Sequence, residues 1–244
     1  MEHELWLTAL FNRFLAGPAN SLLGAFHLHV EDAAKPWANW MVMELLVFAI
    51  ALVLFAVLRT RLSVDKPGKL QHIFEVVYKF LLDTANEVDV HNPGRFVAYF
   101  GTLFIFILFC NLIGVIPTFE SPTMFPMVPA GLALATFAYY NYAGMREHGP
   151  FKYMAHFAGP MPALAPLMVP IELVSHMARP LSLTVRLFAN MFAGEQVTLA
   201  FLKLTLVFAP ALFMGLHVFV SLLQAYIFTL LTMIYVASAV AHEH

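Results

Sequence analysis

A single arginine lies inside one of the most apolar stretches of this chain. Arg186 is at the centre of residues 180–192, whose other side chains are apolar, hydroxyl or amide groups. A guanidinium stays protonated at every physiological pH, and placing it at the centre of a membrane costs about 3 kcal/mol on insertion scales. A cation in such a place predicts a functional site with an anionic partner. No acidic residue near it in the sequence clearly provides that partner.

The polar residues that precede and follow Arg186 share one face of a predicted helix. At about 100° per residue, a helix over residues 170–202 places six polar side chains on one stripe. They are Glu172, Ser175, Arg179, Ser182, Arg186 and Asn190. Glu195 comes nine residues after Arg186, which places it on nearly the opposite face and about 13 Å further along the axis.

A second polar stripe follows in residues 205–241, which contain no Asp, Glu, Lys or Arg. Its members are His217, Ser221, Gln224 and Tyr235. A helix with this stripe can offer His217 to Glu195 and Gln224 to Arg186. Carboxylates and histidines relay protons, whereas an arginine can block their passage and attract an anion, so the pattern suggests proton transport. Structural alternatives are a buried ion pair for Arg186, a packing role for His217 and an interface anchor for Tyr235.

Composition indicates an all-α polytopic membrane protein. Of 244 residues, 61% are hydrophobic and 11% are charged, against about 25% charged in soluble domains. The net charge of −2 argues against nucleic acid as a partner, and the single cysteine, Cys110, excludes an internal disulfide and a cysteine-based metal site. His27 and His29 lie near two acids, but a solvated segment is a better interpretation than a metal site.

No known catalytic or nucleotide-binding motif occurs in the chain. Zinc-protease, Walker and nucleophile-elbow spacings are all absent. We therefore expect no cofactor, no metal and no catalysis within this chain.

About five transmembrane helices are expected, over residues 41–58, 96–116, 125–143, 170–202 and 205–241. Residues 1–40 are predicted to be an interfacial segment with Pro18 and Pro36 as breaks, because tryptophans favour the membrane boundary. Four prolines are expected to break the chain before the fourth span: Pro160, Pro162, Pro166 and Pro170. The uncharged segment 205–241 has 37 residues, more than the about 20 needed for one crossing. They form either two short spans broken near Pro210 and Gly215 or one long, tilted helix.

Charge near the first span predicts the orientation in the membrane. Residues 59–69 form a basic loop, which the positive-inside rule assigns to the cytoplasm. The N-terminus is then periplasmic, and five crossings leave the C-terminus cytoplasmic. Residues 70–88 have apolar positions at helical spacing with charges between them, which predicts an amphipathic helix on the cytoplasmic surface.

The residues around Arg186 resemble a known family. The run 182–195, Ser-Leu-Thr-Val-Arg-Leu-Phe-Ala-Asn-Met-Phe-Ala-Gly-Glu, resembles the signature of subunit a of bacterial F-type ATP synthases. Residues 223–228, with His217 before them, and residues 235–244 are also similar to that family. The strong resemblance covers residues 170–244, and the first span, the basic loop and residues 111–117 resemble it more loosely. Ala189 stands where many members have glycine.

The resemblance implies a stator subunit in the bacterial inner membrane. Its partners would be a rotating ring of c subunits, the b subunits of the peripheral stalk, the rest of the complex and membrane lipids. Residues 1–40 would be a periplasmic segment, and residues 41–244 a proton-channel domain whose residues 170–244 form a long tilted hairpin following the ring.

The resemblance also implies a role for individual residues. Arg186 would face the ring carboxylate, while Glu195 and His217 would form the outer half-channel. Asn190 and Gln224 would be polar neighbours of the arginine, and Glu172 would lie on the cytoplasmic exit path. Ser182 and Tyr235, on the same two stripes, complete the predicted set for proton translocation.

Two other classes of function remain as alternatives. A secondary transporter or ion channel with a gating arginine would also need a buried cation, although transporters often carry inverted repeats, and none is found here. An intramembrane enzyme would need a nucleophile with a base, or metal ligands at the depth of the membrane centre, and neither is evident.

Overall fold

The structure is a computed structural model that describes residues 4–25, 35–64, 67–116, 118–156, 165–204 and 208–241. Within these ranges the chain is helical and contains no strand, so the predicted all-α polytopic membrane fold is confirmed. His27, His29, Pro160 and Pro162, which figured in the sequence predictions, lie outside the described residues.

Eight α-helices and two short 3-10 helices are found in the described part of the chain. The α-helices are α1 (Trp6–Ala25), α2 (Asn39–Thr60), α3 (Lys69–Glu87), α4 (Val97–Ile113), α5 (Met127–His148), α6 (Pro150–His156), α7 (Ala165–Leu204) and α8 (Phe208–Val240). The 3-10 helices are η1 (Pro93–Arg95) and η2 (Pro122–Met124). The predicted spans correspond to α2, α4, α5, α7 and α8, and the predicted amphipathic helix to α3.

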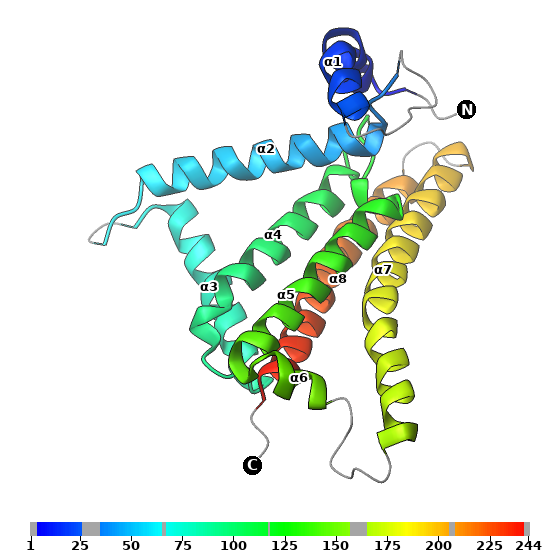
Figure 1. Ribbon diagram of the computed structural model, residues 1–244. Helices are drawn as coiled ribbons and strands as arrows, with labels where there is room; N and C mark the ends of the chain where they lie inside the picture. Colours follow the sequence, from blue (N-terminus) through cyan, green and yellow to red (C-terminus); the bar gives the residue numbers. More distant parts are fainter. Residues whose placement is uncertain are drawn as a thin grey trace.

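Four of the long helices form a bundle around the main core. Helices α4, α5 and α8 lie side by side, α7 runs along one side of them, and α2 leads away from the bundle before α3 returns to it (Figure 1). The core between them is filled by fully buried side chains such as Phe100, Ile107, Tyr140 and Met233. This bundle fixes how α7 and α8, the helices with the polar stripes, face each other.

Much of the apolar surface of the chain is left uncovered by the chain itself. By length and composition alone, α2 and residues Leu212–Val240 of α8 can cross a membrane, and α4 is a shorter apolar helix. Large side chains of α2 such as Phe48, Leu52 and Val53 are exposed. A surface of this kind needs lipid or apolar partner helices around it, as expected for a membrane protein.

Proline residues do not end the helices where the sequence predicted breaks. Helix α1 continues through Pro18, and α7 begins at Ala165 and continues through Pro166, Pro170 and Pro180. In hydrocarbon, ending a helix would leave more backbone groups unpaired than a proline does, so prolines are tolerated there. The hydroxyl of Thr184 also donates to the Pro180 carbonyl at 2.8 Å, one turn back. The prediction that Pro170 starts the fourth span was therefore wrong.

The last apolar segment forms one long helix. Helix α8 has 33 residues and continues through Gly215, so the option of two short spans is wrong. Pro210 lies in its first turn, where a backbone N–H has no partner within the helix and its loss costs little. At 1.5 Å per residue α8 is about 50 Å long, against about 30 Å of hydrocarbon, so it must tilt or protrude.

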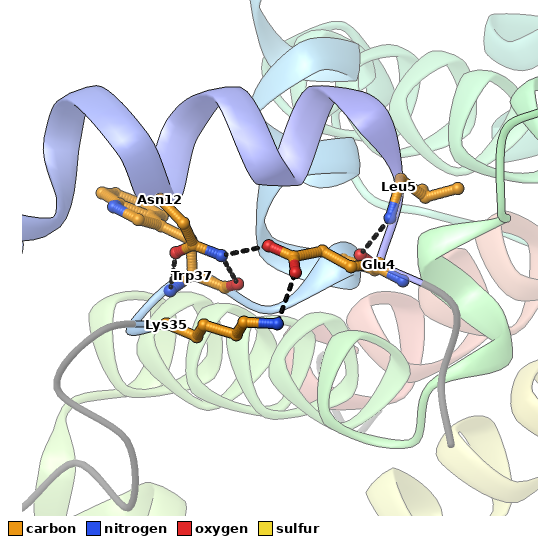
Figure 2. A network of polar contacts seen from close by, with 6 residues as sticks. Glu4, Leu5, Asn12, Lys35 and Trp37 are labelled. Atoms are coloured by element: carbon orange, nitrogen blue, oxygen red, sulfur yellow. Dashed lines mark hydrogen bonds and ion pairs between the residues drawn. The ribbon is translucent and has the colours of Figure 1, made fainter.

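The N-terminal segment is a helix tied to the start of α2. The Asn12 amide donates to Glu4 at 3.0 Å, and Glu4 pairs with Lys35 at 2.6 Å (Figure 2). The side-chain oxygen of Asn12 accepts the Trp37 backbone N–H at 3.0 Å. The backbone N–H of Leu5 donates to the side chain of Asn39, the first residue of α2, at 3.2 Å. These bonds hold α1 against the N-terminal end of α2 (Figure 1).

Candidate functional site

Arg186 lies at the edge of the buried face of α7. Leu183, Leu187 and Met191, spaced four residues apart, are fully buried and hold α7 against the bundle. Arg186 precedes Leu187 and is half-buried, whereas Ser182 and Asn190, one turn away on either side, are exposed. The polar stripe therefore follows the outer surface of α7 rather than the interior of the bundle.

Arg186 has no anionic partner in the described part of the chain. Across those residues its guanidinium makes neither a hydrogen bond nor an ion pair, unlike Arg179, which lies 3.8 Å from Glu172 on the same helix. The structural alternative of an internal ion pair for Arg186 thus finds no support. A charge left in this position calls for an anion from outside the described part of the chain.

Two contacts fix how α7 and α8 are aligned. A Cβ built on Gly194 would lie 3.2 Å from Nδ1 of His217, and the Arg179 guanidinium lies 5.2 Å from the ring centre of Tyr235. The two helices are therefore antiparallel. Seven residues on from His217, Gln224 lies at the level of Leu187, next to Arg186. Gln224 is buried, but it and Arg186 are not hydrogen-bonded to each other.

Glu195 and His217 lie near each other without a direct bond. One carboxylate oxygen of Glu195 and Nε2 of His217 are buried with no hydrogen-bond partner among the described residues, and so is the Ser221 hydroxyl. Each unsatisfied buried group of this kind costs about 1 to 3 kcal/mol unless water reaches it. Three such groups close together indicate room for water between the part of α7 that carries Glu195 and the part of α8 that carries His217.

A buried polar network beside His217 was missed in the sequence. Thr123 donates to Oδ1 of Asn111 at 2.6 Å, and the Asn111 amide donates to the Ser221 carbonyl at 3.3 Å. Ser121 contacts Thr123 at 2.7 Å and donates to the Cys110 carbonyl at 2.9 Å. The ring of His217 also lies close to the Asn111 backbone. The only signal available in the sequence was an asparagine at the end of an apolar span, followed by hydroxyl residues in a loop.

A second polar cluster lies toward the other end of the bundle. There Arg179 contacts both Glu172 and Tyr235, so the structure brings these two predicted residues together. Beside them Nε2 of His176 lies 3.0 Å from Oδ1 of Asn141, which also accepts the Tyr153 hydroxyl. Since that oxygen can only accept, His176 carries a proton on Nε2.

No group of metal-ligating side chains is found in the described ranges. Three or more His, Cys, Asp or Glu side chains do not come together there in a way that could hold a metal ion. The described side chains of the two clusters can bind protons, form hydrogen bonds and carry charge.

The chain is similar throughout its length to one group of proteins. The family model described as ATP synthase A chain matches residues 41–237. ATP synthase subunit a of Solibacter usitatus is 66% identical over 96% of this chain and all of its own length. ATP synthase subunit a of Koribacter versatilis is 47% identical over all of both chains. ATP synthase subunit a 1 of Syntrophotalea carbinolica is 40% identical over 98% of both. These similarities do not favour a secondary transporter or an unrelated channel.

Proposed function

Since the chain belongs to the ATP synthase A chain family, we propose that it works as the stator proton channel of a bacterial F-type ATP synthase. In this role two offset half-channels pass protons to and from a carboxylate on a rotating ring of c subunits. The observation that carries the proposal is the position of Arg186, which is half-buried on the outer face of α7 with no anionic partner in the described part of its own chain.

Arg186 supplies the fixed charge of the mechanism. A ring carboxylate that arrives beside it is attracted as an anion, because a guanidinium never releases its proton. The same positive charge repels protons and so prevents a direct leak between the two half-channels. Asn190 and Ser182, exposed on the same face, and Gln224, at the level of Arg186 on α8, provide hydrogen-bonding groups along this surface.

Protons reach the ring through the outer half-channel. A proton enters by water and by the side chains of Glu195 and His217, whose unpaired buried atoms line the path. It neutralises the ring carboxylate, which can then turn into lipid because its desolvation penalty has fallen. A membrane potential supplies about 2.3 kcal/mol per charge per 100 mV to this step.

Protons leave through the inner half-channel. After nearly a full turn the ring carboxylate meets the end of α7 that carries Glu172, and there it gives up its proton. Arg179 contacts both Glu172 and the ring of Tyr235 on this path. The chain itself is then non-catalytic, and ATP is made elsewhere in the complex.

The proposed stator role also implies the partners of the chain, its membrane and its orientation. The partners are the c-subunit ring at α7 and α8, the b subunits of the peripheral stalk, the rest of the complex and lipid. The membrane is the bacterial inner membrane, with residues 1–40 on its periplasmic side and residues 41–244 forming the channel domain. Arg146 and Lys152 support a cytoplasmic C-terminus, because this basic region lies at the C-terminal end of α8, where Gly144 packs against Ala239.

Replacing the charge of Arg186 tests the proposal. In inverted membrane vesicles, Arg186→Ala should abolish ATP-driven proton pumping and ATP synthesis while the complex still assembles with its ring. Val185→Ala is the matched control, because Val185 is the exposed neighbour of Arg186 and carries no charge. Pumping near the wild-type rate in Arg186→Ala would refute the proposed function, as would purification of the chain without a ring-forming subunit.

A further inference from the structure

Glu120 lies at the outer end of the bundle, two residues before η2. It is half-buried, and Oε2 of its carboxylate accepts the side-chain N–H of Asn39 at 3.2 Å. Asn39 is itself buried, and its side-chain oxygen holds the backbone N–H of Leu5. The start of α2 and the N-terminal segment thus position a carboxylate that lies 81 residues further along the chain.

The loop that carries Glu120 packs on the half of α7 that contains Glu195. Helix η2 contacts α7 as well as α2, α4 and α5, and the carboxylates of Glu120 and Glu195 lie close enough to repel each other electrostatically. The two acids are therefore placed to hold and exchange protons.

The polar groups beyond Glu195 continue this line into the bundle. His217 is only 8% exposed, and its Nε2 has no hydrogen-bond partner in the described residues. Glu195 also has one buried oxygen without a partner. Glu120 and Glu195 are both half-buried and His217 is buried, so the carboxylates lie nearer to water than the imidazole does, as a path from water into the bundle requires.

We propose that Glu120 is the outermost proton-relay residue of the inlet half-channel, held at its mouth by Asn39 and the N-terminal segment. The inference rests on the proposed function. A proton from periplasmic water binds the Glu120 carboxylate, and water passes it to the carboxylate of Glu195. Glu120 returns to its ionised form, and no bond other than these O–H bonds is formed or broken.

Other acidic and basic groups near this mouth have different contacts. Lys35 and Glu4 pair with each other on the N-terminal segment. Glu44, on α2, is half-buried and acts electrostatically on Cys110. Among the described groups at this end, Glu120 is the one whose charge acts on Glu195.

The test uses the whole ATP synthase in liposomes with the periplasmic face inside. An imposed gradient drives protons outward through the inlet, and the rate of ATP synthesis is measured. Glu120→Gln should lower this rate about tenfold. The loss should be smaller than the about 10²- to 10⁴-fold that a positioned acid–base group can contribute, because water still reaches Glu195. Glu120→Asp should retain most of the activity, because a carboxylate remains.

Chemical rescue separates a relay from a structural role. The impermeant buffer MES, trapped in the lumen, can deliver protons at the mouth and should restore synthesis by Glu120→Gln, whereas an equal osmolarity of sucrose should not. Near wild-type synthesis by Glu120→Gln without buffer would overturn the relay. So would a loss that luminal MES does not restore, or an equal loss in Glu120→Asp.

The same assay distinguishes the relay from the proposed function on which it rests. If Arg186→Ala also synthesises ATP at the wild-type rate, the proposed function fails. If Arg186→Ala is inactive while Glu120→Gln is fully active, the stator role stands and only the relay is wrong. Ring content of each purified complex confirms that the variants compared are assembled.

Discussion

The hydroxyl of Thr123 holds the polar network beside the proposed inlet, and removing it should destabilise the fold. Thr123 and Asn111 are both 0% exposed, and their hydrogen bond is 2.6 Å long. Asn111 Oδ1 can only accept, so the Thr123 proton is committed to it. The single proton of Ser121 must then be shared between Thr123 and the Cys110 carbonyl. Thr123 is therefore the donor that this network cannot replace.

Thr123→Val keeps the shape of the side chain and removes this donor. The lost hydrogen bond is worth about 1 kcal/mol, and Asn111 Oδ1 is left buried and unsatisfied at about 1 to 3 kcal/mol. We expect the free energy of unfolding to fall by about 2 to 3 kcal/mol, allowing for some regained apolar contact. Thr123→Ser is the control, because it keeps the hydroxyl and loses one methyl group, worth about 1 kcal/mol.

The measurement is an SDS titration of the purified chain, followed by tryptophan fluorescence. The valine variant should unfold at a clearly lower SDS fraction than the serine variant. If the two variants unfold together, or if the serine variant is the less stable, the hydroxyl does not hold the network and the reasoning fails.

Three further predictions concern the polar helices and the N-terminal segment. In Gly194→Ala the new methyl group would lie 3.2 Å from His217, so the ring must shift by a few tenths of an ångström. ATP synthesis should fall severalfold, and an unchanged rate would show that the ring position is not critical. Because the half-buried Arg186 guanidinium has no partner among the described residues, Arg186→Leu should be more stable than wild type in the SDS titration, although inactive. A loss of stability in this variant would reveal an internal partner. The hydrogen bond from Lys35 lowers the pKa of Glu4 below 4.5. The ionised Glu4 carboxylate therefore contributes to the stability of the N-terminal segment fully above pH 4.5, and this contribution is lost as the pH falls through the lowered pKa. Amide hydrogen exchange in α1 should become faster over that pH range, and the increase should be smaller in Lys35→Gln.

The main elements of this fold could be predicted because membrane helices follow local rules. The amphipathic helix expected over residues 70–88 is α3, Lys69–Glu87, since its apolar spacing and flanking charges are all local signals. The prediction was misled at Pro170, because a rule learned from helices in water does not weigh the cost of unpaired backbone groups in hydrocarbon. The predicted break at Pro18 was also wrong, since α1 continues through it.

The candidate site was only partly predictable for a similar reason. Arg186 is conspicuous because its charge conflicts with its own apolar neighbours, which the sequence displays directly. Asn111 and Ser221 are 110 residues apart, and their contact depends on how α4 packs on α8. Asn39 reaches Glu120 across 81 residues. The sequence around these polar residues does not distinguish them from residues exposed to water. Their contacts arise only when the helices pack together.

The two arginines of the proposed proton path differ in what satisfies their charge, and the proposed mechanism gives a reason for this difference. At the inner end Arg179 is satisfied by Glu172 and by the ring of Tyr235, within the chain. Arg186, only seven residues away and two turns along the same face, is left without such a partner among the described residues. A guanidinium already paired internally would have to break that pair before it could attract a passing carboxylate, which would slow every step of the ring. An unpaired one loses stability in the isolated chain but is ready to bind each anion as it arrives. Under the proposed function, the cost of Arg186 is thus offset in the assembled complex rather than in the fold of this chain.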